Sequence, residues 1–306
     1  MAASALPDHI LSDVKVHQKS VLPITILDEY LKDIKKMVIR SSDVIIVTWP
    51  KSGTTWLQFI VSQIFHGQES DDMGHVFGEH FFLEMAQTFP SSDVGEGVYK
   101  IAVDAPSPRF LKSHLLLKFL PEELTTKKPK VIYVARNPKD AAVSFFHFSE
   151  MIKTMPDFSS WDECFDLFCK GLIPFGDWFE HVLPFWKLRD EPNVLFLKYE
   201  DLKKDLKKSV AQISTFLEKP ITEDQLDDIC KGSTFQKMKE NPKANPDLFN
   251  WTAGKDWKKP TGKHIQFLRK GQVGDWKNLF TVAQSERFDE IYNDKLKGTG
   301  LTFQFE

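Results

Sequence analysis

The sequence predicts an α/β protein built on a single central parallel β-sheet that is flanked by helices. Short runs of β-branched residues recur along the chain, and a turn and then a helical pattern follow each run. Strands that alternate with helices in this way form parallel sheets with helices on both faces. The chain shows no internal repeat and no linker of distinct composition. We therefore expect one domain over residues 1–306, and 42% hydrophobic with 13% aromatic residues excludes a mainly disordered chain.

The first unit of this pattern lies in the N-terminal quarter of the chain. Residues 44–49 form a nearly unbroken β-branched run, which is typical of a strand covered on both faces. Residues 50–53 break the pattern, and helical spacing of apolar residues resumes over 54–65. The sequence therefore predicts a strand, a turn and a helix in direct succession.

A second copy of the pattern and several further elements follow. Pro138 can begin the helix of the second copy. Thr222 and Gln225 have the spacing of a capping box, which begins a helix that Gly232 can close. The remaining predicted elements are strands at 130–135 and 194–199, and helices at 26–37, at 138–152, at 205–217 and between Ser159 and Gly171.

Charge and cysteine content narrow the class of protein. The 40 Lys and Arg residues and 43 Asp and Glu residues leave a formal net charge of −3, which excludes a chain-wide basic surface for nucleic acid. Cys164, Cys169 and Cys230 form no Cys-x-x-Cys pair for zinc, and we expect three buried, reduced thiols. The chain begins without a basic segment followed by an apolar one, and no apolar run is long enough to span a bilayer. These patterns indicate a cytoplasmic protein with no membrane and no nucleic-acid partner.

The segment at residues 49–56 carries the first chemical signal. It lies between a strand and a helix, where backbone N–H groups and the helix dipole favour an anion. Gly53 lets the backbone approach that anion closely, and Lys51 adds a positive charge. Thr54 and Thr55 add hydroxyl donors. The order differs from a Walker A motif because the lysine precedes the glycine, and an ordinary helix N-terminus is the alternative interpretation.

Two further segments extend this signal. Arg136 stands at the carboxyl end of a predicted strand, where open α/β sheets bind their ligands, and Ser144 lies about two helical turns further on. Residues 269–271 form an Arg-Lys-Gly segment that can clamp another anion. Taken singly, these residues also suit a surface ion pair, a surface hydroxyl and a solvated basic pair. Together they suggest a ligand with several phosphate-like groups.

These segments carry a resemblance that extends over essentially the whole chain. Residues 51–56, Lys-Ser-Gly-Thr-Thr-Trp, resemble the 5′-phosphosulfate loop of the cytosolic sulfotransferases. Residues 131–144 resemble the family's 3′-phosphate motif, and residues 269–276 resemble its Arg-Lys-Gly-x-x-Gly-Asp-Trp signature. The resemblance implies a P-loop-like α/β fold and transfer of a sulfuryl group from 3′-phosphoadenosine 5′-phosphosulfate (PAPS), with no metal.

The resemblance also implies roles for the residues that match family motifs. His114 would be the general base, Lys112 would steady the transferring sulfuryl group, and Lys51 would neutralise charge on the leaving oxygen. The residues implied for donor binding are Lys51, Ser52, Gly53, Thr54, Thr55, Trp56, Arg136, Ser144, Tyr199, Ser233, Thr234, Phe235, Met238, Phe267, Leu268, Arg269, Lys270 and Gly271. The residues implied for acceptor binding are Phe82, Met85, Lys112, His114 and Phe148.

The identity of the acceptor stays open at this level. Met85 stands where phenol-preferring members often have a second Phe, and residues 240–263 form an irregular loop that is long for the family. The resemblance implies a hydroxyl, or an amine, on a small hydrophobic molecule such as a phenol, steroid, alcohol or xenobiotic. The alternatives are a non-catalytic protein that binds PAPS or its product, and a P-loop kinase. Retention of Lys51 and His114 disfavours the first, and the missing Walker lysine disfavours the second.

A short C-terminal motif bears on assembly. Lys277, Thr281, Val282 and Glu286 match the spacing of the family's dimerisation motif, which implies a homodimer. The pattern alone also fits the start of a helix with Thr281 as its N-cap.

Overall fold

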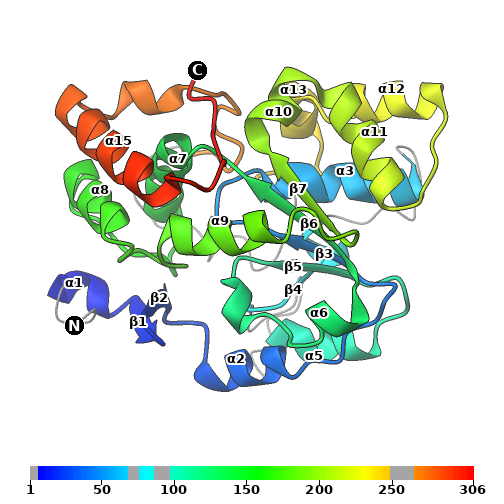
Figure 1. Ribbon diagram of the computed structural model, residues 1–306, viewed down its shortest axis with the longest axis horizontal. Coiled ribbons are helices and arrows are strands. Elements are labelled where there is room, and N and C mark those ends of the chain that lie inside the picture. Colours follow the sequence, from blue (N-terminus) through cyan, green and yellow to red (C-terminus); the bar gives the residue numbers. More distant parts are fainter. Residues whose placement is uncertain (1–5, 68–75, 86–96, 249–264) are drawn as a thin grey trace.

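A five-stranded, all-parallel sheet forms the centre of the computed structural model, which describes residues 6–67, 76–85, 97–248 and 265–306 (Figure 1). The strand order is β4-β5-β3-β6-β7. The strands are β3 (Val44–Val47), β4 (Phe81–Phe82), β5 (Phe110–Ser113), β6 (Lys130–Ala135) and β7 (Val194–Lys198). The predicted α/β class with a central parallel sheet is therefore confirmed.

The central strand β3 explains why the sheet has helices on both of its faces. Val44 and Ile46 belong to one apolar cluster, whereas Ile45 and Val47 belong to another. Each of these side chains is at most 3% exposed. Successive side chains of a strand point to opposite faces, so a strand that is apolar throughout must be covered on both sides.

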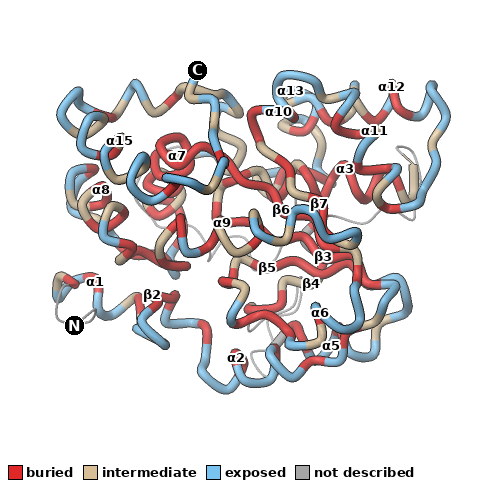
Figure 2. Tube along the Cα trace, viewed as in Figure 1, coloured by how far each residue is buried: buried red, intermediate tan, exposed pale blue. Residues whose placement is uncertain are grey.

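Two groups of helices provide this cover (Figure 1). One face packs against residues of α3 (Thr54–His66), α10 (Tyr199–Lys204), α11 (Leu206–Phe216) and α12 (Glu223–Gly232). The larger cluster on the other face includes residues of α2 (Asp28–Lys35), α7 (Pro138–Met151), α8 (Trp161–Cys169), α9 (Trp178–Lys187) and α15 (Val282–Leu296). Buried residues follow the sheet and the inner sides of these helices in Figure 2.

The remaining elements are short. They are α1 (Asp8–Leu11), the antiparallel pair β1 (Val14–His17) and β2 (Ser20–Pro23), α4 (Val76–Glu79), α5 (Gly97–Asp104), α6 (Leu124–Lys127), α13 (Phe235–Glu240) and the 3₁₀ helices η2 (Leu117–Phe119) and η3 (Asp275–Asn278). Sequence analysis missed the β1–β2 hairpin because Gln18 and Lys19, at φ 47° and 67°, form its turn without glycine or asparagine. It also missed α9, whose helical pattern contains Pro184.

Several predicted helix starts are confirmed by their capping bonds. Thr222 and Gln225 form the expected reciprocal box at the start of α12, and Thr281 caps α15 in the same way. Pro138 follows the N-cap Asn137 of α7. The predicted start of α8 was wrong by one residue, because its side-chain cap is Ser160 and not Ser159.

The prediction of three buried thiols is wrong for two of the cysteines. All three cysteines are unpaired, but only Cys164 is buried, while Cys169 and Cys230 are partly exposed at the surfaces of their helices. The long loop expected at 240–263 lies outside the described residues from 249 onward. Among the described residues, no helix combines the length and the apolar character needed to cross a bilayer.

Candidate active site

The predicted site residues gather at the carboxyl edge of the sheet. Lys51 follows β3, His114 follows β5, Arg136 follows β6 and Tyr199 follows β7. Met85 lies just beyond β4. Because all five strands are parallel, their carboxyl ends meet at one edge of the sheet. The strands β4 and β5 lie on one side of β3, and β6 and β7 lie on the other, so the strand order reverses direction at β3. Ligands of open α/β sheets bind at such a point.

The loop between β3 and α3 has an unusual backbone. Lys51 has φ 65° and Gly53 has φ 104°, and α3 begins at the next residue, Thr54. A Cβ atom on Gly53 would lie 2.9 Å from Cδ2 of Tyr199, so only glycine fits here. The Ser52 hydroxyl is buried and has no hydrogen-bond partner among the described residues. These features suit a loop whose backbone holds an anion at a helix N-terminus.

The Lys51 ammonium is held between two aromatic rings. Nζ lies 4.3 Å from the ring centroids of both Phe148 and Phe267. Burial, together with the charges of Lys112, Arg136 and Arg269, lowers the pKa of Lys51 to about 7. A bound anion would offset this mutual repulsion. The donor set therefore fits a ligand with several negative charges.

Arg136 joins this loop to a segment far along the chain. Its Nη1 donates to the Lys51 carbonyl at 3.3 Å, and its Nη2 donates to the Gln272 carbonyl at 2.8 Å. The guanidinium also lies 4.5 Å over the ring of Tyr199. Nε is buried without a partner in the described part of the chain. Ser144 shares a narrow cavity with Lys51 and with the 265–269 segment.

The Arg-Lys-Gly segment at 269–271 is anchored by Asp275. Arg269 and Lys270 each pair with one carboxylate oxygen of Asp275. Burial would raise the pKa of Asp275, but the bonds from the two cations hold it down at about 2. Gly271 has φ 62°, and a Cβ there would lie 2.3 Å from Cδ2 of Phe235. Glycine is therefore required where this segment approaches α13.

Asp140 on α7 ties the two basic segments together. Its carboxylate accepts the backbone N–H groups of Gly274 and Trp276, both at 2.9 Å. It also accepts from the Asn137 side chain at the start of α7. The N-terminus of α7 and the C-terminal segment, more than 130 residues apart, therefore form one structural unit.

The residues expected around adenosine also lie together, and several of their polar groups form hydrogen bonds within the protein. Trp56 Nε1 donates to the Ser233 carbonyl at 2.8 Å, and Gln63 Nε2 donates to the Ser233 hydroxyl at 2.8 Å. The Thr234 hydroxyl donates to the Lys231 carbonyl at 3.1 Å. Met238, whose side chain is buried, packs in a small cluster with Leu268 beside it.

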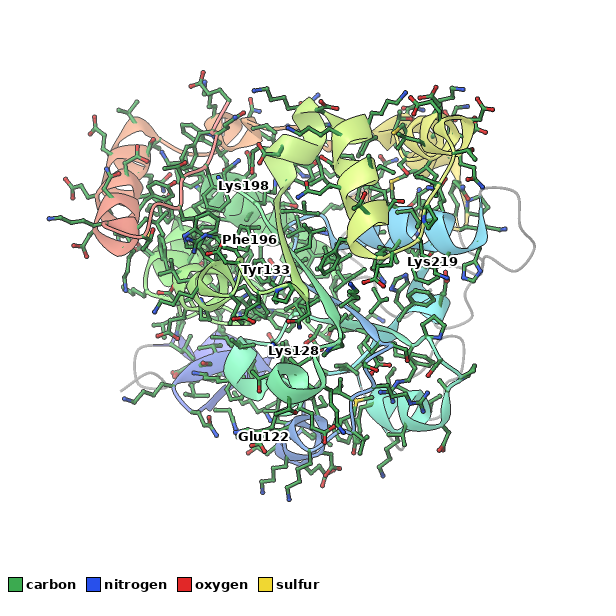
Figure 3. All side chains as sticks on the ribbon, turned by 45° about the vertical axis from the view of Figure 1, so that its right-hand side comes forward. Glu122, Lys128, Tyr133, Phe196, Lys198 and Lys219 are labelled. Carbon is green, nitrogen blue, oxygen red and sulfur yellow. The ribbon has the colours of Figure 1, made fainter. Side chains whose placement is uncertain are left out.

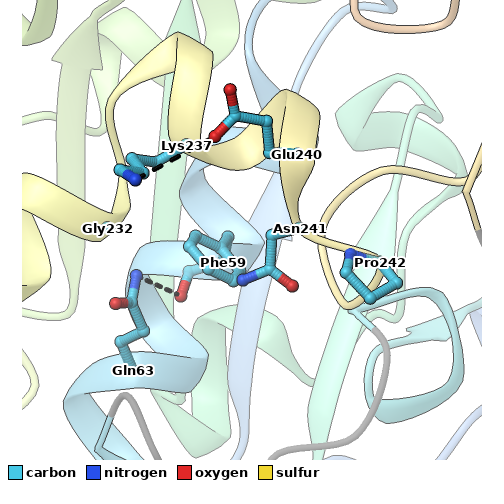
Figure 4. A pocket seen from close by; sticks show the side chains of 7 residues that line it. All are labelled: Phe59, Gln63, Gly232, Lys237, Glu240, Asn241 and Pro242. Carbon is cyan, nitrogen blue, oxygen red and sulfur yellow. Dashed lines mark hydrogen bonds and ion pairs between the residues drawn. The ribbon is translucent and has the colours of Figure 1, made fainter.

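A cavity of about 370 Å³ lies next to this group, between α3 and α13 (Figure 4). Phe59 and Gln63 of α3 line it, together with Lys237, Glu240 and Asn241. None of its lining residues belongs to the predicted donor or acceptor sets. The buried Gln63 Oε1, which has no partner in the described structure, is closed off from solvent.

His114 has one ring nitrogen engaged. Nδ1 lies 2.9 Å from the Thr48 carbonyl, and because a carbonyl only accepts, Nδ1 carries the proton. Nε2 is then the nitrogen with the free electron pair. Burial lowers the pKa of His114 well below its usual value, and the neighbouring Lys112 adds to the effect. The rings of Phe82 and Phe175 meet the imidazole edge-on, at 5.2 and 5.5 Å.

Lys112 and Glu84 complete this side of the site. The Lys112 ammonium lies 4.0 Å over the ring of Phe82, and burial lowers its pKa to about 8, against the opposing effect of Glu84. Glu84 is 2% exposed, and burial raises its pKa to about 7 although its Oε1 accepts the His114 N–H at 2.5 Å. The two side chains thus hold one positive and one titratable negative group beside His114.

Three residues of this site were missed by sequence analysis. Thr48 and Glu84 act through contacts between different strands, which no local pattern marks. Phe175 is buried at φ 71°, a backbone conformation that is strained for an aromatic residue and tends to occur at functional sites. Within the described residues, no group of three or more His, Cys, Asp or Glu side chains is placed to hold a metal ion.

Comparison with known proteins decides the family. Residues 41–300 match the sulfotransferase domain family. Human sulfotransferase 1C2 is 41% identical over 89% of this chain and 89% of its own length. The chain belongs to the sulfotransferase family. Mouse sulfotransferase 1A1 is 38% identical to this sulfotransferase over 94% of this chain and 95% of its own.

Solved structures agree with this sulfotransferase in fold. Mouse sulfotransferase SULT7A1, solved with PAP, has a TM-score of 0.75 and 29% identity over 94% of this chain and 96% of its own. Retinol dehydratase, solved with retinol and PAP, has a TM-score of 0.82 and 26% identity over 93% of this chain and 89% of its own. The predicted family, fold and sulfotransferase class are therefore confirmed.

Proposed function

We propose that this sulfotransferase transfers the sulfuryl group of PAPS to the hydroxyl, or the amine, of a small hydrophobic acceptor. The observation that carries the proposal is the juxtaposition of a neutral His114, whose Nε2 has no hydrogen-bond partner among the described residues, with a largely buried cluster of cations around Lys51. Structural neighbours that hold PAP, the desulfated product of PAPS, support the choice of donor. A base beside an anion site is what sulfuryl transfer to a hydroxyl needs.

The donor would be held by two phosphate sites and an adenosine site. Residues 51–56 would hold the 5′-phosphosulfate at the N-terminus of α3. Arg136, Ser144 and residues 269–271 would surround the 3′-phosphate, with Asp140 keeping these segments in register. The adenosine would lie among Trp56, Tyr199, Ser233, Thr234, Phe235 and Met238, with Phe267 and Leu268 alongside.

The residues of the site would act in a single displacement at sulfur. PAPS supplies an activated sulfuryl group on a good leaving group. His114 Nε2 takes the proton of the acceptor hydroxyl as its oxygen attacks the sulfur. Lys112 neutralises charge on the transferring sulfuryl oxygens, and Lys51 neutralises the oxygen that departs with PAP. The lowered pKa of His114 in the free enzyme keeps the imidazole neutral and ready to accept.

The acceptor side of the site is apolar. Phe82 and Phe175 border the imidazole, and Phe148 contacts the Lys51 ammonium. Met85 provides a flexible wall next to β4. Such walls orient a hydrophobic acceptor without specifying a single structure, so acceptance should be broad.

The proposal is tested by transfer of labelled sulfate from PAPS to a panel of phenols, steroids, alcohols and amines. Wild-type enzyme should sulfate at least one class, and His114→Ala should lower kcat by about 100- to 10,000-fold while PAP binding is unchanged. His9→Ala is the matched control, because His9 is an exposed histidine that pairs with Glu163 far from the site. Tight PAP binding with no turnover on any acceptor would support the non-catalytic alternative.

We also propose the finer features of assembly and location. Lys277, Thr281, Val282 and Glu286 are all exposed, with Val282 at 76%, which supports their use as a small homodimer contact. Three unpaired cysteines support a reducing, cytoplasmic compartment. A single domain over residues 1–306 fits one five-stranded sheet that has helices on both faces. Equilibrium sedimentation of wild type and Val282→Glu tests the dimer.

A further inference from the structure

The backbone of His114 lies just beyond the end of the sheet ladder. The last paired residues of β3 and β5 are Val47 and Ser113, and the Ser113 carbonyl accepts the final bond, from the Thr48 N–H, at 3.3 Å. The peptide groups of His114 are therefore not fixed by strand pairing. Two buried side chains hold these peptide groups in place of a neighbouring strand.

These side chains come from distant elements. Glu84 Oε1 accepts the His114 N–H at 2.5 Å, and His181 Nε2 lies 3.0 Å from the His114 carbonyl oxygen. His181 belongs to α9, 67 residues away in the chain, and it is fully buried. Both polar groups of the His114 main chain are thereby held from outside the strand.

The hydrogen-bonding state of His181 follows from its partners. A carbonyl oxygen only accepts, so Nε2 of His181 must carry a proton. Its Nδ1 lies 2.7 Å from the Tyr133 hydroxyl. Burial lowers the pKa of His181 to about 4 and raises that of Tyr133 well above its usual value, so both groups are neutral. Tyr133 therefore donates to Nδ1, so the partners of both ring nitrogens suit the tautomer in which Nε2 donates to His114.

Tyr133 is itself immobilised in the centre of the sheet. It lies in β6, and its ring stacks on Phe185 at 4.3 Å and on Phe196 at 5.3 Å. Figure 3 shows Tyr133 and Phe196 next to each other, on the neighbouring strands β6 and β7. The hydroxyl therefore has a fixed direction from which to orient His181.

We propose that His181 is a positioning residue for sulfuryl transfer, and that Tyr133 supports it through a hydrogen bond to Nδ1. By fixing the His114 carbonyl, it sets the peptide plane from which the catalytic imidazole projects. Thr48 then sets the rotation of the ring through Nδ1. The chain Tyr133–His181–His114 aims Nε2 at the acceptor hydroxyl. This inference rests on the proposed role of His114 as the base.

The test compares three variants in the full-length enzyme. His181→Leu removes the donor to His114, and kcat should fall by about 10- to 100-fold, as expected when a catalytic group is misplaced. His181→Gln keeps an N–H donor at the position of Nε2 and should recover most of the wild-type kcat. Tyr133→Phe removes the donor to Nδ1 of His181 and should lower kcat by a smaller factor. In all three, the Kd for PAP should stay at the wild-type value, because His181 bonds to the His114 main chain and Tyr133 reaches the 49–56 segment at the Trp49 main chain, ahead of residues 51–56.

A spectroscopic measurement reads the tautomer directly. Long-range ¹H–¹⁵N spectra of histidine-labelled enzyme should show His181 as the Nε2–H form in wild type and in Tyr133→Phe, because the His114 carbonyl oxygen only accepts. This readout keeps the inference testable if His181→Leu does not fold. An Nδ1–H form of His181 in wild type would overturn the inference, because Nε2 could then not donate to the His114 carbonyl.

The outcomes separate this inference from the proposed function. If His114→Ala abolishes turnover but His181→Leu and His181→Gln have equal kcat, His114 is the base and His181 does not position it. If all His181 variants lose PAP binding and turnover together, the role of His181 is structural and the inference is wrong. If His114→Ala retains full turnover, the proposed function itself fails.

Discussion

Lys51 should take up a proton when PAP binds. In the free enzyme, burial and the neighbouring cations Lys112, Arg136 and Arg269 lower its pKa from 10.5 to about 7. Bound phosphate would reverse the repulsion and raise the pKa again, so the complex holds Lys51 in its charged form. By linkage, a group whose pKa rises on binding takes up protons above its free pKa, and affinity falls as the pH rises.

The size of the effect follows from the free pKa. At pH 8 only about one tenth of the free Lys51 is protonated, so binding should take up about 0.9 proton per site. Above pH 7, PAP affinity should fall by about tenfold per pH unit. At pH 8 the phosphate of PAP is already fully ionised, since its second pKa is about 6, and it contributes no protons of its own.

Isothermal titration calorimetry measures this uptake. The enthalpy of PAP binding at pH 8 is recorded in buffers of different ionisation enthalpy, and the slope gives the number of protons. Lys51→Arg is the control, because a guanidinium stays charged at every accessible pH, and it should bind with little uptake. Zero uptake by wild type, or equal uptake by wild type and Lys51→Arg, would refute the reasoning.

Three further predictions concern packing and titration. Gly271→Ala and Gly298→Ala, at φ 62° and 75°, should each lose about 1–2 kcal/mol of unfolding free energy. Only Gly271→Ala should weaken PAP binding, because no atom lies within 4 Å of a Cβ on Gly298; equal Kd values for the two would contradict this. Burial raises the pKa of Glu84 from 4.5 to about 7, so the unfolding free energy of wild type falls as the pH rises from 4.5 to about 7, where this residue is ionised mainly in the unfolded chain. Denaturant unfolding should therefore show Glu84→Gln gaining up to about 3 kcal/mol over wild type between pH 5 and pH 8, and a constant difference would be the opposing result. Asp43→Ala leaves the 1%-exposed Arg109 without its bidentate partner and should lower unfolding free energy by about 3–5 kcal/mol; a loss below 1 kcal/mol would argue against this role.

The strands were predictable because their residues are apolar on both faces. The strand expected at 130–135 coincides with β6. Its short apolar run is rich in β-branched residues, and such a run is buried most readily as a strand of a covered sheet. The strand expected at 44–49 ends two residues early, at Val47. The next residue, Thr48, hydrogen-bonds through its carbonyl to Nδ1 of His114. The β1–β2 hairpin was not predictable, because its turn uses Gln18 and Lys19 at positive φ, which local propensity disfavours.

The residues of the active site also fall into those that the sequence could predict and those that it could not. Residues such as Lys51 and Arg136 could be found because they directly follow buried strands, and the sheet brings strand ends together. Glu84 and His181 could not, because each acts on the main chain of His114 through space. Their spacing to His114, 30 and 67 residues, carries no periodic signal. Only the three-dimensional course of β4 and α9 reveals them.

The dependence of the donor site on the C-terminal segment has a consequence for synthesis on the ribosome. The five strands are complete once residue 198 has been made, but the bonds that tie Asp140 to the C-terminal segment form only after Gly274 and Trp276 have been added. Trp276 is in turn secured by its Nε1 bond to the Phe305 carbonyl at 2.9 Å. A nascent chain must therefore fold its sheet from apolar burial alone, without help from a bound nucleotide. Cellular PAPS can stabilise only chains whose translation has reached this last segment.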